Sequence, residues 1–274
     1  SGIAIDVDGV FYTISGTVAT SVTYSVDRVP FKIQCDGTSF YILTTADKVY
    51  KYPQTTFTAD IYDMEATNGA IYYIKNDKSV LKGATAMTYS VAATLNVFPR
   101  VRPLADDAVL ITFGLTGNSN TQHFYQGPDH PSTGADSLTT ATLVNFDTPA
   151  NPAQMNNPDP IDFIGRRGGC NFIISDGLIL GWGATCADMA NQAYPTIISH
   201  LAFGLNKIDG VLDLQCNDKC YIFTRGDVYE LKKTITSIDS TCLNMRLKVG
   251  GTGYYCASKG TANRYEDFLT VNNW

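Results

Sequence analysis

The sequence lacks the features of two large classes of protein. No apolar run approaches the roughly 20 residues that cross a bilayer as a helix, so we expect no membrane insertion. Basic residues are few, with 20 Lys and Arg against 26 Asp and Glu, and they cluster only at Arg166-Arg167 and Lys232-Lys233. A nucleic-acid partner is therefore not expected. With 44% hydrophobic and 17% charged residues, the composition is typical of a globular protein.

Common catalytic and metal-binding motifs are also missing. The three histidines show no HExxH spacing and the cysteines no zinc-type pairing, so the sequence predicts neither a metal site nor a cofactor. No Gly-x-Ser-x-Gly elbow is present, and His200 lies in an apolar stretch, where a buried structural histidine is expected. These absences favour a protein that is not an enzyme.

Paired carboxylates are the remaining enzymatic alternative, as in glycoside hydrolases or lyases with acidic residues at the axis of the fold. Aspartates at predicted turns are expected to cap backbone amides instead, and these are Asp8, Asp36, Asp106 and Asp107. Other aspartates begin predicted strands and could line a channel, namely Asp63, Asp162 and Asp213.

One short phrase recurs along the chain. A turn-forming pair such as Asp-Gly or Asn-Gly is followed by an apolar or aromatic run, the strongest short signal for a β-hairpin. The copies are anchored at Phe11, Phe40, Ile71, Val109, Phe172, Tyr221 and Tyr254. Each copy is part of a pattern of four short strands, expected at 31–35, 40–44, 49–52 and 57–61, at 63–66, 71–74, 80–81 and 87–91, and at 212–216, 221–223, 228–231 and 235–238.

This pattern resembles the repeats of β-propeller proteins in architecture, without the Gly-His and Trp-Asp pairs of WD40 repeats or the Asp-box of sialidases. It predicts an all-β fold: a seven-bladed β-propeller of short four-stranded blades, forming a single domain over residues 1–274. The ends, 1–7 and 268–271, are expected to complete one sheet together. A β-sandwich, two small β-domains and a β-solenoid are the alternative folds.

The fourth and fifth repeats are longer than the others, and enlarged loops on a repeat scaffold often form the binding face. A long insertion at about 114–160 is rich in Pro, Asn and Gly, which predicts little regular structure. It contains His123 and His130, which we expect to be solvated. Gly181-Trp182-Gly183 has two interpretations of equal weight, an exposed ring that stacks on a sugar or a ring buried over a blade. The residues predicted to bind a ligand are Trp182, Arg166, Arg167, Tyr125 and Tyr194.

The seven cysteines favour an oxidising compartment. Their spacing predicts three short-range disulfides, Cys170–Cys186, Cys216–Cys220 and Cys242–Cys256, and leaves Cys35 over. We therefore expect an extracellular or surface-exposed protein, and the surface could be that of a virion.

Together these patterns predict a recognition module without enzymatic activity, which binds a glycan, as a lectin does, or a protein partner. The alternatives are a structural component of an extracellular or viral assembly, and the carboxylate enzyme described above.

Overall fold

The structure is a computed structural model, and it places the backbone of most of the chain. It describes residues 2–6, 8–24, 26, 29–67, 69–91, 97–105, 107–114, 121–131, 133–144, 163–175, 177–183, 192–197, 210–216, 219–224, 226–231, 236–247, 254–258 and 269–272. Of these, the backbone alone is described for residues 114, 121, 163, 178, 192–197, 226, 236–247, 254–258 and 269–272.

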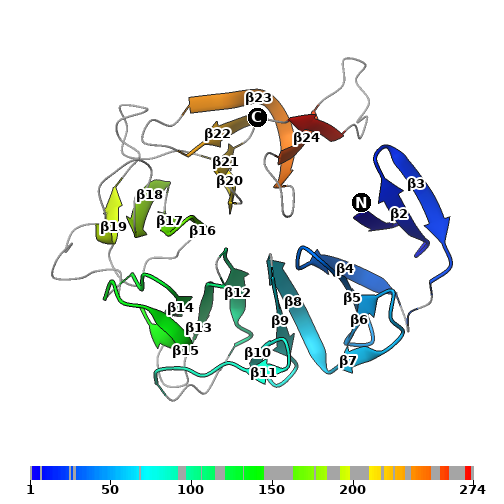
Figure 1. Ribbon diagram of the computed structural model, residues 1–274, viewed down its shortest axis with the longest axis horizontal. Coiled ribbons are helices and arrows are strands. Elements are labelled where there is room, and N and C mark those ends of the chain that lie inside the picture. The colour runs from blue at the N-terminus through cyan, green and yellow to red at the C-terminus, as the bar shows by residue number, and fades with distance from the viewer. Residues whose placement is uncertain are drawn as a thin grey trace. The chain divides into compact units, whose positions relative to one another are not determined.

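All the regular structure in the described residues is β-strand, arranged in antiparallel sheets, and the chain divides into two compact units. The described residues of unit 1, Ser1–Met87, form three sheets. They are β1 (Gly2–Ile5), β2 (Phe11–Ser15) and β3 (Val18–Val22); β4 (Pro30–Cys35), β5 (Phe40–Thr44), β6 (Lys48–Tyr52) and β7 (Phe57–Ala59); and β8 (Ile61–Thr67), β9 (Ala70–Lys75), β10 (Val80–Lys82) and β11 (Thr85–Ala86). Each sheet follows the order of the sequence, so every strand pairs with the next (Figure 1).

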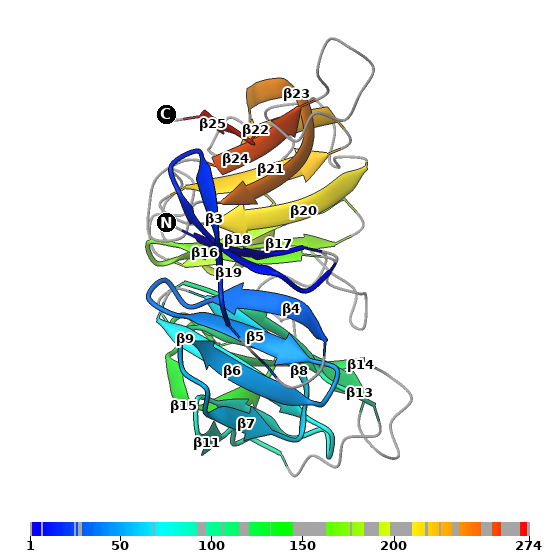
Figure 2. The ribbon, with the colours of Figure 1, turned by 90° about the vertical axis from the view of Figure 1, so that its right-hand side faces the viewer.

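Unit 2, Thr88–Trp274, also contains three sheets among its described residues. They are β12 (Arg100–Pro103), β13 (Val109–Gly114), β14 (Thr121–Gly127) and β15 (Ser137–Leu143); β16 (Phe163–Arg167), β17 (Cys170–Ser175), β18 (Leu178–Gly183) and β19 (Gln192–Ile197); and β20 (Val211–Cys216), β21 (Cys220–Thr224), β22 (Gly226–Glu230), β23 (Thr236–Leu247), β24 (Tyr254–Ser258) and β25 (Leu269–Asn272). Figure 2 shows β20 to β25 at one end of this unit.

The hydrophobic cores lie between neighbouring sheets. In unit 1, side chains of β5 and β6 pack against β8 and β9, as Leu43 and Val49 do against Ile61 and Met64. In unit 2, one core joins the β12–β15 and β16–β19 sheets, and a second joins the latter to β20–β22. β17 contributes side chains to both of these cores, and β17 and β21 are buried along their whole length. This explains why these strands read as continuous apolar runs rather than alternating ones.

The strands predicted for the second repeat match β4 to β7 within two residues at each end. The fourth strand of the third repeat was predicted wrongly at 87–91, because the two-residue turn after Lys82 reverses the chain earlier and closes β11 at Thr85–Ala86. Segment 88–90 instead runs along the outer edge of β15, where Thr88 Oγ1 donates to the carbonyl of Thr139 at 3.1 Å.

The predicted insertion at 114–160 contains more regular structure than expected. Its described residues include all of β14 and β15, which are the third and fourth strands of the sheet that begins at β12. Pro128, Pro131 and Gly134 lie between these two strands, while segments 115–120 and 145–160 lie outside the described residues.

The two ends of the chain do not pair with each other in the described residues. β1 pairs with β2, and β25 pairs with β24. The predicted sixth and seventh repeats share one six-stranded sheet, because β23 pairs with β22 through its first half and with β24 through its second. The number of seven blades and the single domain remain predictions.

Candidate functional site

The first strands of three sheets share a local irregularity. In β4, β8 and β20 the pairing with the next strand skips one residue near the start, which is the signature of a β-bulge. The skipped residues are Phe31, Tyr62 and Leu212, and each is a large apolar side chain left exposed, at 58%, 48% and 47% respectively. Bulges at the edge of a sheet commonly redirect a side chain towards a binding site. The same exposed position thus recurs in both units.

Aspartates stabilise two of these bulges. Asp63 Oδ1 accepts a hydrogen bond from the backbone N–H of Met64 at 2.8 Å, and Asp213 Oδ1 accepts one from Leu214 at 2.9 Å. After the bulge the strands alternate, so that Met64 and Leu214 are buried while the polar residues on either side face away from the core. In β4 the position that corresponds to these aspartates is occupied by a lysine, Lys32.

Lys32 joins β4 to β8 in unit 1. Its Nζ lies 2.7 Å from Asp63 Oδ1 and 2.7 Å from Glu65 Oε1, and Gln34 Nε2 donates to Glu65 Oε2 at 3.0 Å. These four residues form what we call the Lys32 cluster. The three charged side chains are a quarter to a third exposed. The Lys32 cluster therefore carries one net negative charge and remains within reach of a ligand.

The electrostatics of the Lys32 cluster follow from this geometry. Burial lowers the pKa of the Lys32 ammonium, but the hydrogen bonds and negative charges of Asp63 and Glu65 outweigh burial and raise that pKa above its ordinary value. Lys32 is thus firmly protonated at neutral pH. It holds Asp63 and Glu65 together on one strand, so this pair does not flank an open space as the two carboxyl groups of a glycosidase do.

Aspartates at turns cap backbone amides, as predicted for Asp36. Its Oδ1 accepts hydrogen bonds from the N–H groups of Thr38 and Ser39, and its Oδ2 accepts one from the Tyr41 hydroxyl at 2.8 Å. Burial raises the pKa of the Asp36 carboxyl, but these hydrogen bonds outweigh it and lower the pKa below its ordinary value.

In the first repeat the carboxylate that caps the turn is Asp6, whereas Asp8 was expected. Asp6 Oδ1 accepts hydrogen bonds from the N–H groups of Asp8 and Val10, and Asp6 Oδ2 accepts one from the Tyr12 hydroxyl. The prediction for Asp8 was therefore wrong by two residues, because the capping carboxylate stands before the turn rather than within it. Asp106 and Asp162 lie outside the described residues.

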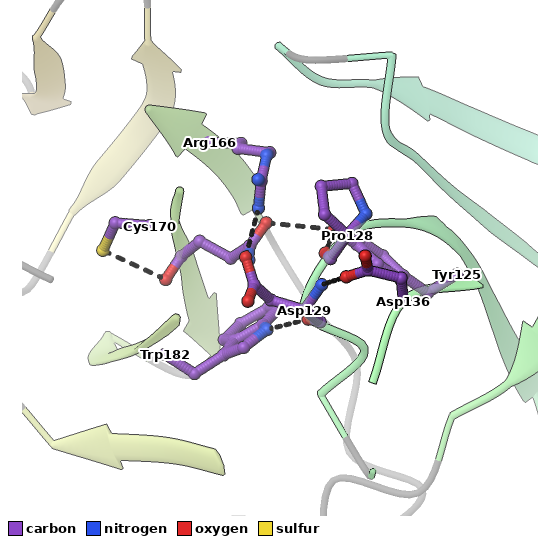
Figure 3. Close-up of polar contacts among 8 residues, drawn as sticks. Tyr125, Pro128, Asp129, Asp136, Arg166, Cys170 and Trp182 are labelled. Atoms are coloured by element: carbon purple, nitrogen blue, oxygen red, sulfur yellow. Dashed lines mark hydrogen bonds and ion pairs between the residues drawn. The ribbon is translucent and has the colours of Figure 1, made fainter. Parts of the chain in front are cut away.

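Three of the five residues predicted to bind a ligand meet in unit 2, around the turn between β14 and β15 (Figure 3). Trp182 Nε1 donates to the carbonyl oxygen of Asp129 at 2.7 Å, and Arg166 Nη1 lies 3.4 Å from Asp129 Oδ2. The Tyr125 hydroxyl donates to the carbonyl of Pro128 at 2.6 Å, and its oxygen lies 3.3 Å from Asn171 Oδ1. The contacts of Asp129 hold the turn against β16 and β18, and Tyr125 reaches Asn171 on β17.

Burial decides between the two interpretations of Trp182. The indole is fully buried, as is Tyr125, and the Arg166 side chain is 3% exposed. The flanking glycines fit a buried ring. The pairing of β18 with β19 shifts between Gly181 and Gly183, and the backbone there lies too close to the start of β17 for a larger residue at 183. At Gly183, with φ of 108°, a Cβ atom would overlap the carbonyl oxygen of Gly169. In this structure the ring supports the fold and offers no face to a sugar.

The other two predicted ligand residues are placed differently. Arg167, at the end of β16, is exposed next to buried Arg166. For Tyr194, on β19, only the backbone is described. Binding of a ligand by any of the five residues remains a prediction. His123 and His130, expected to be solvated, are both buried, and His123 Nδ1 lies 2.9 Å from Thr112 Oγ1.

One predicted disulfide is present in full. Cys216 and Cys220 face each other across the β20–β21 hairpin and are bonded. Cys170 is also disulfide-bonded, and Cys186, its predicted partner, lies outside the described residues. For Cys242 and Cys256 only the backbone is described, so this pair remains a prediction. Cys35 is a free thiol, as expected.

The described part of the chain contains neither a metal-binding cluster nor a membrane-spanning helix. No group of three or more His, Cys, Asp or Glu side chains there is arranged to hold a metal ion. None of its segments forms a helix long and apolar enough to cross a membrane.

Comparison with known proteins shows the fold. Neither a protein-family profile nor a curated protein sequence matches this chain. Human WBSCR16 is similar in structure, with a TM-score of 0.58 and 11% identity over 83% of this chain and 72% of that one. Yeast RCC1 (Prp20), solved bound to Kap60, has a TM-score of 0.53 and 10% identity, over 84% of this chain and 68% of its own. BBS1N, solved in complex with ARL6DN, has a TM-score of 0.50 and 10% identity, over 93% of this chain and 83% of its own.

The chain has a β-propeller fold. The predicted architecture is thereby confirmed. The repeated bulge is what sequence reasoning missed, although it leaves a readable pattern. Three segments at the same phase of the repeat alternate apolar and polar residues in the same way, namely Phe31-Lys32-Ile33-Gln34, Tyr62-Asp63-Met64-Glu65 and Leu212-Asp213-Leu214-Gln215.

Proposed function

We propose that this β-propeller is a recognition module without enzymatic activity and that its ligand is a segment of a protein. The observation that carries the proposal is the repeated bulge, which leaves Phe31 and Tyr62 exposed at equivalent positions of β4 and β8, the first strands of two sheets. Large apolar side chains next to a few fixed polar groups are the usual composition of the centre of a protein interface.

The polar groups of this surface are ordered in advance. The Lys32 cluster joins β4 to β8 immediately beside the two bulges and fixes the side chains that a ligand would meet. Binding then requires little further loss of side-chain freedom, which is a major cost of association. Two of the propellers with similar folds were solved with protein partners, Kap60 and ARL6DN. These partners support a protein ligand in this fold, although the sequence identity of about a tenth does not identify it.

A protein ligand is favoured over a glycan because the strongest argument for a glycan was an exposed Trp182, and that ring is buried. We also propose that the protein is extracellular or displayed on a surface. The oxidised Cys216–Cys220 pair supports this localisation, because such bonds persist mainly in oxidising compartments.

The test begins by selecting peptides on the wild-type protein from a random displayed library, and then measures their Kd by fluorescence anisotropy. The double variant Phe31→Ser/Tyr62→Ser should weaken binding at least about 10-fold, which corresponds to about 1.4 kcal/mol. Leu138→Ser is the matched control, because Leu138 on β15 is 61% exposed, close to the 58% of Phe31.

Equal affinity of the selected peptides for wild type and double variant would contradict the proposal, as would a library that yields no ligand. A glycan array serves as the second arm. Glycan binding that survives the double variant would show that the ligand is a sugar and that it binds elsewhere.

A further inference from the structure

The outer strand of a sheet presents unpaired backbone N–H and C=O groups, and proteins usually protect such an edge. Most outer strands of this protein are protected in a recognisable way. β7 and β11 are only three and two residues long. β15 is covered by segment 88–90, whose Ser90 N–H donates to the carbonyl of Ala141 at 2.9 Å. β19 contains Pro195, which has no N–H to offer.

Among the residues that the structure describes, nothing protects β3 in any of these ways. It is five residues long, and no bulge interrupts its pairing with β2. In the described residues it pairs on one side only, within a sheet that has three strands where the neighbouring sheets of unit 1 have four (Figure 1). Val18 to Ser21 are all exposed, Val18 at 61%. No charged residue lies between Asp8 and Asp27, so β3 itself carries no charge that would repel a second strand.

The pairing with β2 determines which backbone groups of β3 point outwards. Ser15 and Val18 close a two-residue loop, and such a closing pair is hydrogen-bonded. Hydrogen-bonded pairs alternate along the ladder, so Thr20 and Val22 also bond to β2. The N–H and C=O groups of Ala19 and Ser21 are therefore directed to the free edge.

The sequence of this edge is nearly symmetric about Thr20. Read in either direction, residues 17–23 run Thr, Val, a small residue, Thr, a small residue, Val, Thr. An antiparallel copy with Thr20 opposite Thr20 would place Val18 opposite Val22 and Thr17 opposite Thr23. Ala19 and Ser21, whose backbone groups point outwards, would face each other and form hydrogen-bonded pairs. Val–Val and Thr–Thr are favourable cross-strand pairs, and no like charges meet.

We propose that the free edge of β3 binds the same edge of a second copy of this chain. The two strands pair antiparallel across a two-fold axis at Thr20, and the two three-stranded sheets join into one of six strands. Such a contact is isologous, so it closes as a dimer and does not propagate. It is independent of the proposed ligand surface at Phe31 and Tyr62.

The first test measures self-association by sedimentation velocity up to about 500 µM, which reaches affinities of a weak dimer. Wild-type protein should show a dimer whose fraction rises with protein concentration. Thr20→Lys should weaken it at least about 10-fold, because two lysines then stand directly opposite each other. Thr58→Lys is the matched control, since Thr58 is an exposed threonine on the outer strand β7, and it should leave the dimer unchanged.

The second test determines the register. Thr20→Glu should weaken the dimer as Thr20→Lys does, because like charges again face each other. An equimolar mixture of the two variants should form a heterodimer at about the wild-type affinity, because the opposite charges now face each other at the two-fold axis. Native mass spectrometry separates the three species, and circular dichroism confirms that each variant is folded.

A wild-type protein that is monomeric throughout the concentration range would overturn the proposal. So would a dimer that Thr20→Lys does not weaken, since it must use another surface. Variants that self-associate less but fail to recombine in the mixture would overturn the two-fold axis at Thr20.

Discussion

The Lys32 cluster makes a prediction about stability that can be worked out from its geometry. In Lys32→Met the apolar stem of the side chain is nearly preserved, while the charge between Asp63 and Glu65 is lost. Two ion pairs with N···O distances of 2.7 Å disappear, and two carboxylates remain side by side on β8 without a cation. The variant should therefore fold but unfold more easily than wild type.

The magnitude depends on how far water screens the cluster. Exposed ion pairs contribute about 0.2–1 kcal/mol each, and hydrogen bonds to charged groups about 1.5–3 kcal/mol. Since the side chains are a quarter to a third exposed, we take a value near the upper limit for exposed pairs, about 1 kcal/mol each. The expected loss is about 2 kcal/mol, which corresponds to about 4–8 °C in Tm for a chain of this size.

The assay is urea denaturation of wild type, Lys32→Met and the triple variant Lys32→Met/Asp63→Asn/Glu65→Gln. The triple variant should recover most of the loss, because neutral amides do not repel each other. Since the pKa of Lys32 is raised, its contribution is complete below the ordinary lysine value of about 10.4 and is lost as pH rises through the folded value. A loss of less than about 0.5 kcal/mol, or a triple variant no more stable than the single one, would refute this reasoning.

Three further changes test the packing of unit 2. Gly183→Ala should cost at least about 3 kcal/mol in chemical denaturation, because φ is 108° and the new Cβ meets the carbonyl of Gly169. If Gly183→Ala were as stable as wild type, the shift in β18–β19 pairing could not lie at Gly183. Trp182→Phe should cost about 1–3 kcal/mol, since the carbonyl of Asp129 loses the indole N–H, and loss of near-ultraviolet dichroism at the tryptophan band reports the site. Burial lowers the pKa of His130, so its contribution to stability is complete above the ordinary value of about 6.5 and declines as pH falls towards the folded value. The free energy of unfolding should therefore depend less on pH in His130→Gln than in wild type between about pH 7.5 and 5.5, and an equal dependence in both would contradict this prediction.

The turn pairs and the apolar runs that follow them predicted the strands of the second repeat well, because each hairpin is a local structure. The second repeat illustrates this, since the turn Asp36-Gly37 places Cys35 opposite Phe40 with the register that the alternation of residues requires. Turn chemistry and strand pattern agree there over a few residues, and no distant contact is needed to decide the outcome.

The candidate site was harder to predict because it depends on contacts between sheets. Lys32 and Asp63 are 31 residues apart, and nothing local to either indicates that they form an ion pair. Trp182 was ambiguous for the same reason, because its partner is a backbone carbonyl 53 residues away on the turn after β14. A bulge also changes which face a side chain takes, so strands predicted from turn pairs and apolar runs did not reveal that Phe31 and Tyr62 are exposed.

The long strand β23 links the last part of the chain in an unusual way. Its first half completes the ladder with β22 and its second half begins the ladder with β24, so one uninterrupted backbone belongs to both. Separating the two ladders requires the strand itself to break. Amide protons of strands β20 to β25 should then exchange with solvent in a single cooperative opening, rather than blade by blade as in an ordinary repeat protein.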